Sequence, residues 1–477
     1  MQINSWQVLK FGGNSVSNLA CWQTIATIIK KHLLQPTRIL VVCSALGGIS
    51  NKLEAILKAA VTSQHEDLLA EIILSHQKLA TELGVDLRAH VGAELDDLQK
   101  LLTGISLLRE ISPGTHAKVM SFGEILLTKL GAAYLEKNCF PTTWCDARSL
   151  LISADEAHAH VQSQYLAAKC HYQTDPAVIK ALNAVPTTVA LTQGFIASNS
   201  QGETVLFGRG GSDTSAAYFA AKLAATRCEI WTDVPGIYTA NPHQVPQAKL
   251  LKLLNYDEAQ EIASMGAKVL HPHCIPPLKF NQIPLYVGYT RKPDRAGTEI
   301  TANPPAVGPV SIKSIATKSP IALIQIETVQ MWQQVGFLAD IFQCFKKHGV
   351  SVDLISTSET TVTVTLDLKI NSQDQKIIDA VLAELNSFGK ATAVSSCAIV
   401  SIIGHPIRKV LHQLSDALKI FEEHKVYLVS QAANDLNLSF VVDEDQAPVL
   451  AQQLHSILIE NNHAPLLFDQ SWGEEFL

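Results

Sequence analysis

The segment that follows the first apolar run carries the residue types that phosphate chemistry needs. Lys10 ends the run Trp6–Lys10, and Gly12 and Gly13 come directly after it. Glycines let a phosphate approach backbone N–H groups, and the start of a following helix adds partial positive charge. The lysine can neutralise charge on a transferred phosphoryl group. The alternative is a plain strand-to-helix turn with a surface lysine, and this motif alone supports both interpretations about equally.

A second glycine-rich loop, Phe207–Asp213, precedes an alanine-rich helical segment. Ser212 or Asp213 could simply cap that helix, which is the usual role of such residues. Three glycines around Arg209 nevertheless predict a mobile, exposed loop, and an arginine there suits bidentate capture of a carboxylate or phosphate. The GxxxxGK[ST] spacing is absent, so the chain is not a Walker-type ATPase.

Three further segments contain candidate binding residues. Glu124 is a conspicuous charge in an apolar helical segment, where it needs a partner such as a substrate ammonium group. The stretch Trp231–Pro242 is rich in turn formers and on its own indicates only a structured loop. Lys268 could be an ordinary solvated lysine, and His271 an ordinary helix cap. The 17 histidines show no metal-ligand spacing, so no metal site is assigned.

A pattern of alternating strands and helices must position these residues. Apolar runs of strand length occur at 6–10 and 38–43, each followed by a glycine turn, and helical periodicity covers about 18–32 and about 52–135. Further strand candidates lie at 188–192, 228–232 and 283–287. This alternation predicts an α/β fold with a mostly parallel sheet between helices.

Beyond a linker at 302–309 the pattern becomes compact and repeats. Two Val-x-Leu-x-Ser segments, 352–356 and 426–430, each precede a second strand candidate, at 361–367 and 436–442. With strands at 321–326 and 398–402 and helices between, this predicts two α+β modules of βαββαβ type, although the assignment of strands to copies is open. We expect domains at 1–305, 310–392 and 393–477.

Composition limits the class of protein. Of 477 residues, 47% are hydrophobic and 17% charged, which excludes a mainly disordered chain, and the net charge of −7 disfavours nucleic acid or anionic lipid as partners. No apolar run approaches the ~18 residues of a membrane span, and the N-terminal residues do not resemble a secretory signal. Nine scattered cysteines without a CxxC pair suggest reduced thiols, so we predict a cytoplasmic protein.

Taken together, these segments resemble the aspartokinases of the amino acid kinase family. KFGGxSV at 10–16, GRGGSD at 208–213, TDVPGIYT at 232–239 and GAKVLHP at 266–272 occur in order, and the C-terminal modules resemble paired ACT domains. The likeness spans essentially the whole chain, and the motifs are jointly specific although each is weak alone. It implies the amino acid kinase fold and an enzyme that uses ATP to convert L-aspartate to 4-phospho-L-aspartate, which leads to lysine, threonine and methionine.

The resemblance also implies roles for single residues. Lys10 would contact the transferred phosphoryl group, Asp213 would organise the cationic groups, Arg209 would bind the substrate α-carboxylate and Glu124 its ammonium. Ser50 and Ser212 are the other implied substrate residues. Gly12, Gly13, Ser44, Thr232, Asp233, Tyr238 and Lys268 are the implied nucleotide residues. ATP would bring Mg²⁺, held mostly by phosphates and water, so no dedicated protein metal site is expected. A β-carboxylate, with pKa ~3.9, is already an anionic nucleophile and needs no general base.

The chain departs from the family motifs at three positions. Asn14 and Ser50 stand where threonine is common, and Asn14 puts aspartate affinity in question. His243 stands where arginine is common, and a neutral histidine would lose a bidentate phosphate contact.

These departures leave two rivals to a catalytic, feedback-regulated aspartokinase. One is an amino-acid-binding regulatory protein with an inactive kinase half. The other is a kinase of the same fold acting on another acid, such as acetylglutamate, and the C-terminal modules and the SFGE segment at 121–124 argue against it. The chain is too short to carry a fused homoserine dehydrogenase.

The segments 331–339 and 351–359 resemble the lysine-sensitive branch of the family. The implied effector residues are Met331, Gly336, Phe337, Leu338, Ser351, Val352 and Asp353. Backbone N–H groups at a helix start would meet the effector carboxylate, and Asp353 its ammonium. Alternatively, Phe337 and Leu338 are core and Asp353 is a solvated strand end. Since ACT modules typically pair edge to edge, we expect a homodimer or higher oligomer, with 352–356 and 361–367 as exposed-edge candidates.

Overall fold

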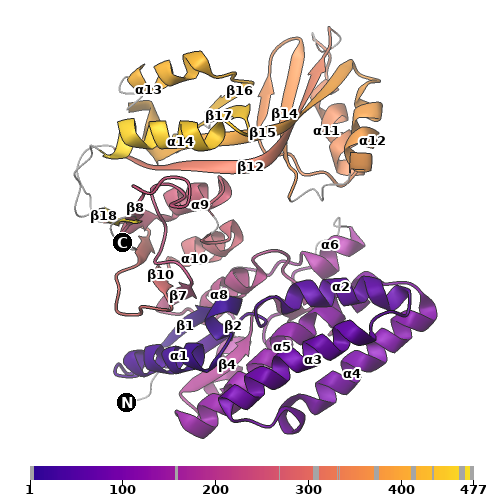
Figure 1. Ribbon diagram of the computed structural model, residues 1–477, viewed down its shortest axis with the longest axis vertical. Helices are drawn as coiled ribbons and strands as arrows, with labels where there is room; N and C mark the ends of the chain where they lie inside the picture. Colours follow the sequence, from indigo (N-terminus) through magenta and orange to yellow (C-terminus); the bar gives the residue numbers. More distant parts are fainter. Residues whose placement is uncertain are drawn as a thin grey trace. The chain divides into compact units, whose positions relative to one another are not determined.

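The computed structural model describes residues 5–155, 160–267, 269–304, 311–329, 331, 333–369, 375–409, 415–431, 434–460 and 468–472. The chain forms two compact units (Figure 1). The first comprises Met1–Ile237, Lys252–Tyr256 and Val269–Pro304, and the second comprises Tyr238–Leu251, Asp257–Lys268 and Pro305–Leu477. Two short segments of the expected catalytic domain therefore belong to the second unit, and the expected domain boundaries stay predictions.

An eight-stranded sheet lies at the centre of the first unit, in the order β3-β4-β2-β1-β7-β10-β11-β9. Strands β3, β4, β2, β1, β7 and β10 are mutually parallel, and β11 runs antiparallel to β10. The mostly parallel sheet is thus confirmed. The strands are β1 (Trp6–Phe11), β2 (Arg38–Cys43), β3 (Thr142–Trp144), β4 (Val189–Gln193), β7 (Arg227–Thr232), β9 (Leu253–Asn255), β10 (Leu285–Tyr289) and β11 (Thr298–Thr301).

Helices pack against this sheet and form the helical region expected from periodicity at 52–135. The helix α5 packs against β2, β3 and β4, and α8 packs against β1, β2 and β7. The helices of the unit are α1 (Leu19–His32), α2 (Ile49–Val61), α3 (Glu66–Leu83), α4 (Leu87–Leu108), α5 (Pro113–Asn138), α6 (Val161–Leu166), α7 (Pro176–Asn183), α8 (Gly211–Lys222) and α10 (Ile275–Phe280). A hairpin of β5 (Ile196–Ser198) and β6 (Thr204–Leu206) precedes α8.

The helix α5 is buried on nearly all sides, which matters because it carries a glutamate. Ser112 caps it by accepting the Thr115 N–H at 3.1 Å, and Pro113 occupies its first turn. At Gly131 an added Cβ would lie 1.9 Å from the Trp22 ring of α1, so only glycine permits this packing. The helix therefore places Glu124 inside the unit rather than on its surface.

The second unit contains a six-stranded sheet in the order β13-β14-β12-β15-β17-β16. Its strands are β12 (Ser311–Glu327), β13 (Ile355–Thr357), β14 (Thr361–Asp367), β15 (Lys390–His405), β16 (Leu428–Gln431) and β17 (Asn437–Asp443). Both modules share the two long strands, because one half of each pairs within the first module and the other half within the second. The expected strands at 321–326 and 398–402 are parts of these longer strands.

Each module has its own apolar core. The helices are α11 (Phe337–Lys347) and α12 (Gln375–Leu385) in the first module, and α13 (Ser415–Lys419) and α14 (Ala447–His455) in the second. Ile341, Phe345 and Val364 belong to the first core, and Val400, Phe440 and Leu450 to the second. The unit also contains α9 (Tyr256–Ser264) and a strand pair, β8 (Lys249–Leu251) with β18 (Phe468–Ser471).

Two details of the expected strands are corrected. The strand expected at 352–356 begins at Ile355, and its three residues are exposed at the sheet edge. The segment 361–367 is β14, an inner strand, because β13 pairs with its outer side, so it offers no free edge. In the described part of the chain, no helix combines the length and apolar character needed to cross a membrane.

Candidate active site

The site is centred on an ion pair between two segments far apart in sequence. Lys10 lies near the end of β1 and is 8% exposed, and Asp213 lies in the first turn of α8. The Lys10 Nζ is 2.5 Å from the Asp213 Oδ1. A buried ammonium requires such a partner, and an acidic residue is favourable in the first turn of a helix. The structure therefore brings together the two residues expected to be catalytic.

A cavity of about 430 Å³ opens beside this pair. It lies at the carboxyl ends of β1 and β2, where ligands bind in open parallel sheets. Gly47, Gly48, Gly210 and Gly211 line it near the starts of α2 and α8, so two helix N-termini favour an anion there. The expected site residues that line it are Lys10, Gly13, Ser44, Ser50, Glu124, Arg209, Ser212 and Asp213.

The glycine loop before α8 is shaped by the GAKVLHP motif. Gly210 has a positive φ of 65°, and an added Cβ would lie 2.1 Å from the His271 ring. The His271 N–H also donates to the Asp213 Oδ2 at 3.3 Å, and burial lowers the pKa of the imidazole. His271 therefore holds the loop that carries Arg209 and Asp213, in addition to capping the turn that follows it.

Glu124 faces the cavity as a buried carboxyl group that lacks a cation. It is 3% exposed, and its Oε1 accepts the Ala45 N–H at 3.1 Å, while its Oε2 has no hydrogen-bond partner among the described residues. Burial raises the pKa of this carboxyl to about 8. Gly123 permits the approach, because an added Cβ would lie 2.9 Å from the Ala45 side chain. The arrangement suits a ligand that brings an ammonium group.

Arg209 is the available cation of the site. Its side chain is exposed and makes no hydrogen bond or ion pair with another described residue, although it lines the cavity. Ser50 lies in the first turn of α2 and Ser212 in the first turn of α8. The cavity thus offers a guanidinium for one anion and Lys10 for another.

The nucleotide residues are only partly brought together. Thr232 ends β7 and Asp233 follows it, and the Asn14 Nδ2 donates to the Asp233 Oδ2 at 2.9 Å. Gly12 precedes the turn that carries Asn14. Tyr238 belongs to the second unit, where it is buried with its ring 5.4 Å from that of Trp472. Lys268 lies outside the described residues.

Sequence reasoning missed Phe195. This residue lines the cavity and has a positive φ of 67°, which is unusual for a bulky side chain. It follows Gly194, where an added Cβ would lie 2.7 Å from the Ser212 side chain. The glycine was the one local signal that the turn after β4 approaches α8.

The expected effector residues lie around one end of α11. Gly336 precedes the helix with a φ of 88°, Phe337 is buried in the module core, and Leu338 is 39% exposed. Met331 packs against the same core. The alternative interpretation, that these two residues belong to the core, is therefore correct for Phe337 and wrong for Leu338.

The segment before β13 carries the other effector residues. Ser351 is exposed and Val352 half-buried. Asp353 is not a solvated strand end, because its Oδ2 lies 2.8 Å from the Lys318 Nζ. The sequence analysis did not identify Lys318, whose Nζ also lies 3.3 Å from the Asp367 Oδ2.

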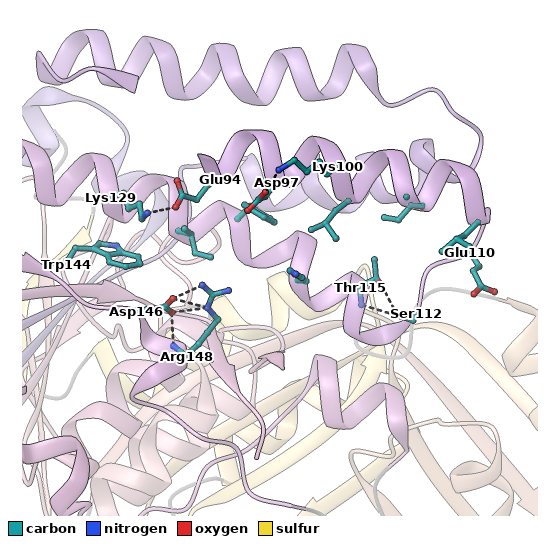
Figure 2. A pocket seen from close by; sticks show the side chains of 17 residues that line it. Glu94, Asp97, Lys100, Glu110, Ser112, Thr115, Lys129, Trp144, Asp146 and Arg148 are labelled. Atoms are coloured by element: carbon teal, nitrogen blue, oxygen red, sulfur yellow. Dashed lines mark hydrogen bonds and ion pairs between the residues drawn. The ribbon is translucent and has the colours of Figure 1, made fainter. Parts of the chain in front are cut away.

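A second cavity in the first unit, about 750 Å³, lies along α4 and α5 (Figure 2). Six of the charged side chains on its walls pair with one another: Lys129 with Glu94, Lys100 with Asp97 at 2.9 Å, and Arg148 with Asp146 at 2.6 Å. Glu110 and Lys118 line it as well. None of the expected site residues lines it. The cavity beside Lys10 is therefore the candidate active site.

The chain is similar to known proteins over most of its length. The amino acid kinase family matches residues 5–289, and an ACT domain matches residues 324–370. The chain is 32% identical over 464 residues to lysine-sensitive aspartokinase 3 of Escherichia coli (strain K12), covering 95% of this chain and 99% of that relative.

Two solved structures are similar over 95% of this chain and 99% of theirs, both at 30% identity. E. coli aspartokinase III with aspartate and ADP, in its R-state, gives a TM-score of 0.80. The same enzyme with lysine and aspartate, in its T-state, gives 0.73.

Proposed function

Because this chain belongs to the aspartokinases of the amino acid kinase family, we propose that ATP phosphorylates the β-carboxylate of L-aspartate in the cavity beside Lys10. The chain is an aspartate kinase with the amino acid kinase fold followed by ACT-type modules. It phosphorylates aspartate at the start of the pathway to the aspartate-derived amino acids. The observation that carries the site assignment is one cavity lined by both the buried Lys10–Asp213 pair and the cation-free Glu124.

The substrate groups match the charges of the cavity. The α-carboxylate binds the exposed guanidinium of Arg209, in a charge-assisted bidentate contact. The ammonium binds Glu124, whose second oxygen has no partner within the described residues. Ser50 and Ser212 add hydroxyl contacts from the first turns of α2 and α8. Both charged substituents of the aspartate α-carbon are thereby held, which leaves the β-carboxylate at the other end of the substrate to meet the phosphoryl group beside Lys10.

The transfer step needs alignment and charge neutralisation more than proton transfer. The β-carboxylate is ionised at neutral pH and attacks directly. Lys10 contacts the transferred phosphoryl oxygens, and Asp213 holds its ammonium in place at 2.5 Å. Gly13 and Ser44 line the cavity beside Lys10, and the family resemblance implies that Gly12 lies near the same oxygens. Charge that spreads over those oxygens in the transition state is then met by groups already in position.

The nucleotide side is carried by Thr232, Asp233, Tyr238 and Lys268, as the family resemblance implies. The E. coli relative is described with ADP, which supports use of a nucleotide. Mg²⁺ would accompany ATP and would be held mainly by phosphate oxygens and water, since Asp213 is already paired with Lys10, Glu124 is assigned to the substrate ammonium, and the other described oxygen donors of the cavity include serine hydroxyls. When bound, the ion neutralises charge on the β- and γ-phosphates.

Lysine is the proposed feedback inhibitor. The similarity to a lysine-sensitive relative, also described with lysine and aspartate in a T-state, supports this assignment. The effector carboxylate binds at the start of α11, beside Gly336. Its ammonium binds the Asp353 carboxylate. Because Lys318 already pairs with that carboxylate, the effector ammonium either shares it with Lys318 or displaces Lys318 from it. Inhibition requires that lysine bind the less active state more tightly.

The proposed assembly is a homodimer or a higher oligomer. Within the described residues, β13 pairs with β14 on one side only and its residues are exposed, so its outer edge, which lies near β16, suits pairing with a second copy. Light scattering at micromolar concentration, with and without lysine, checks the state, and a monomer under both conditions contradicts it. A cytoplasmic location stays a prediction from composition.

An ATP-dependent hydroxamate assay tests the function. Aspartate should yield aspartyl hydroxamate and ADP, whereas acetylglutamate should not react. The rival in which the kinase half is inactive predicts lysine binding without any hydroxamate. Product formed from acetylglutamate in preference to aspartate would assign the chain to another kinase of the same fold.

A further inference from the structure

The last described segment of the chain is joined to the loop that follows the nucleotide motif. Strand β18 pairs with β8 in the second unit, with Phe468 opposite Leu251 and Ser471 opposite Lys249 (Figure 1). Directly after β18, the Trp472 N–H donates to the Ala248 carbonyl at 2.9 Å. Phe468 is 6% exposed, so the strand is an integrated part of the unit.

The Trp472 side chain contacts both halves of the loop Tyr238–Ala248. Its ring lies 5.4 Å from that of Tyr238 at an interplanar angle of 80°, and 5.8 Å from that of His243 at 66°. Both are edge-to-face arrangements, which aromatic rings prefer. The indole also packs on an apolar cluster made of Tyr238, Ala240, Val245, Ala248 and Leu250.

The loop is held by contacts outside a strand ladder: the Ile315 N–H donates to the Thr239 carbonyl at 2.7 Å, and the Thr317 hydroxyl donates to the Gln244 Oε1 at 2.9 Å. The packing of Trp472 adds to these anchors. Within the described residues, its ladder pairing is a single bridge between Tyr238 and Leu250. Asn241 supplies local turns by accepting the N–H groups of His243, Gln244 and Val245. A loop of this kind depends on its packing partners for a single conformation.

We propose that Trp472 is a positioning residue for the nucleotide, which fixes the loop from Tyr238 to Ala248 in the conformation that binds ATP. The proposal rests on the proposed function, in which Tyr238 belongs to the nucleotide side. If the indole is removed, the loop samples more conformations, and apparent nucleotide affinity falls with the fraction that is competent to bind. The ring contacts of Trp472 are with Tyr238 and His243 and not with Lys10, Asp213 or Arg209, so turnover at saturating ATP is preserved.

Steady-state kinetics on the full chain test this assignment. Trp472→Ala should raise the KM for ATP about fivefold, the effect expected when two edge-to-face contacts are lost. Its kcat and its KM for aspartate should stay near wild type. Trp472→Phe keeps an aromatic edge and should restore most of the affinity. Phe280→Ala removes an exposed aromatic of α10 in the first unit and serves as the matched control, with unchanged constants.

A second readout does not depend on turnover. The chain has six tryptophans, so 5-fluorotryptophan labelling gives resolvable ¹⁹F signals, and Trp472→Phe identifies the Trp472 signal by its loss. Addition of ADP should shift that signal. An unshifted signal, together with an unchanged KM for ATP in Trp472→Ala, overturns the proposal and leaves a purely structural tail. A wild-type chain that forms no aspartyl hydroxamate overturns the proposed function instead.

Discussion

The Asn14 amide donates a hydrogen bond to the Asp233 carboxylate, with 2.9 Å between Nδ2 and Oδ2. This contact joins the turn after β1 to the loop after β7. The neighbouring pair reinforces it, because the Ser15 and Thr290 hydroxyls lie 2.8 Å apart and the Thr290 N–H donates to the Thr232 carbonyl. Asn14, one of the three positions where the chain departs from the family motifs, thus links the proposed phosphate side to the proposed nucleotide side.

Substitution of Asn14 should therefore change nucleotide affinity. Asn14→Asp places a like charge beside Asp233 and should raise the KM for ATP by about threefold or more, with a smaller effect on the KM for aspartate. Asn14→Thr restores the common family residue and should give a milder change, since no like charge is introduced. Initial rates at varied ATP and aspartate measure both constants. A change confined to the KM for aspartate would contradict this role and support the interpretation from sequence.

Arg209→Ala should raise the KM for aspartate about tenfold, because the guanidinium is proposed to bind a carboxylate remote from the bond that forms. Its effect on kcat should be much smaller. Asp155→Ala, in a residue that does not line the cavity, is the control for loss of a surface charge. An equal loss in kcat and kcat/KM would instead place Arg209 at the transferred phosphoryl group.

Glu124 makes stability depend on pH. Burial raises the pKa of its carboxyl from an ordinary value of 4.5 to about 8 in the folded protein, so the folded state binds more protons than the unfolded state between these values. The free energy of unfolding should consequently fall as pH rises through this window. Glu124→Gln removes the titration and should flatten that decline. Denaturant unfolding of the wild type and of Glu124→Gln at several pH values in this window measures the decline. Parallel pH profiles of the two proteins would contradict the raised pKa of Glu124.

Asp353→Ala should abolish the proposed inhibition by lysine, since the effector ammonium would lose its proposed partner. Lys318→Met should act in the opposite direction and lower the lysine concentration needed for inhibition, because the internal cation no longer occupies Asp353. Dose–response curves with lysine, and with threonine for comparison, measure both effects. A rate that is unchanged by millimolar lysine but lowered by threonine would instead assign the chain to the threonine-controlled branch.

The sequence predicts those parts of the fold and site that leave a local pattern. The apolar run Arg38–Cys43 is strand β2, and the glycine motifs around Lys10 and Asp213 do meet in one cavity. A continuous apolar run is a reliable signal for a strand of a parallel sheet, because both of its faces are buried. Glycines indicate positions where another group approaches the backbone closely, because they have no Cβ. Gly210 is such a position, since the His271 ring lies against it.

Long-range pairs between ordinary residue types leave no such pattern. Lys318 is one lysine among many, and only the antiparallel arrangement of β12 and β14 places it beside Asp353 and Asp367. Trp472 follows a short tail strand whose partner, β8, is far away in sequence. Local propensity likewise cannot show that 361–367 is an inner strand, because that depends on the pairing of β13.

The most direct test of the account is the turnover of Lys10→Ala with aspartate and ATP, measured together with ADP binding by calorimetry. The ammonium that lies 2.5 Å from Asp213 is proposed to act on the transferred phosphoryl group. We predict that kcat falls by about 100-fold or more, whereas the Kd for ADP changes by much less. Near-normal turnover in Lys10→Ala, with intact ADP binding, would contradict the assignment of this cavity as the site of phosphoryl transfer.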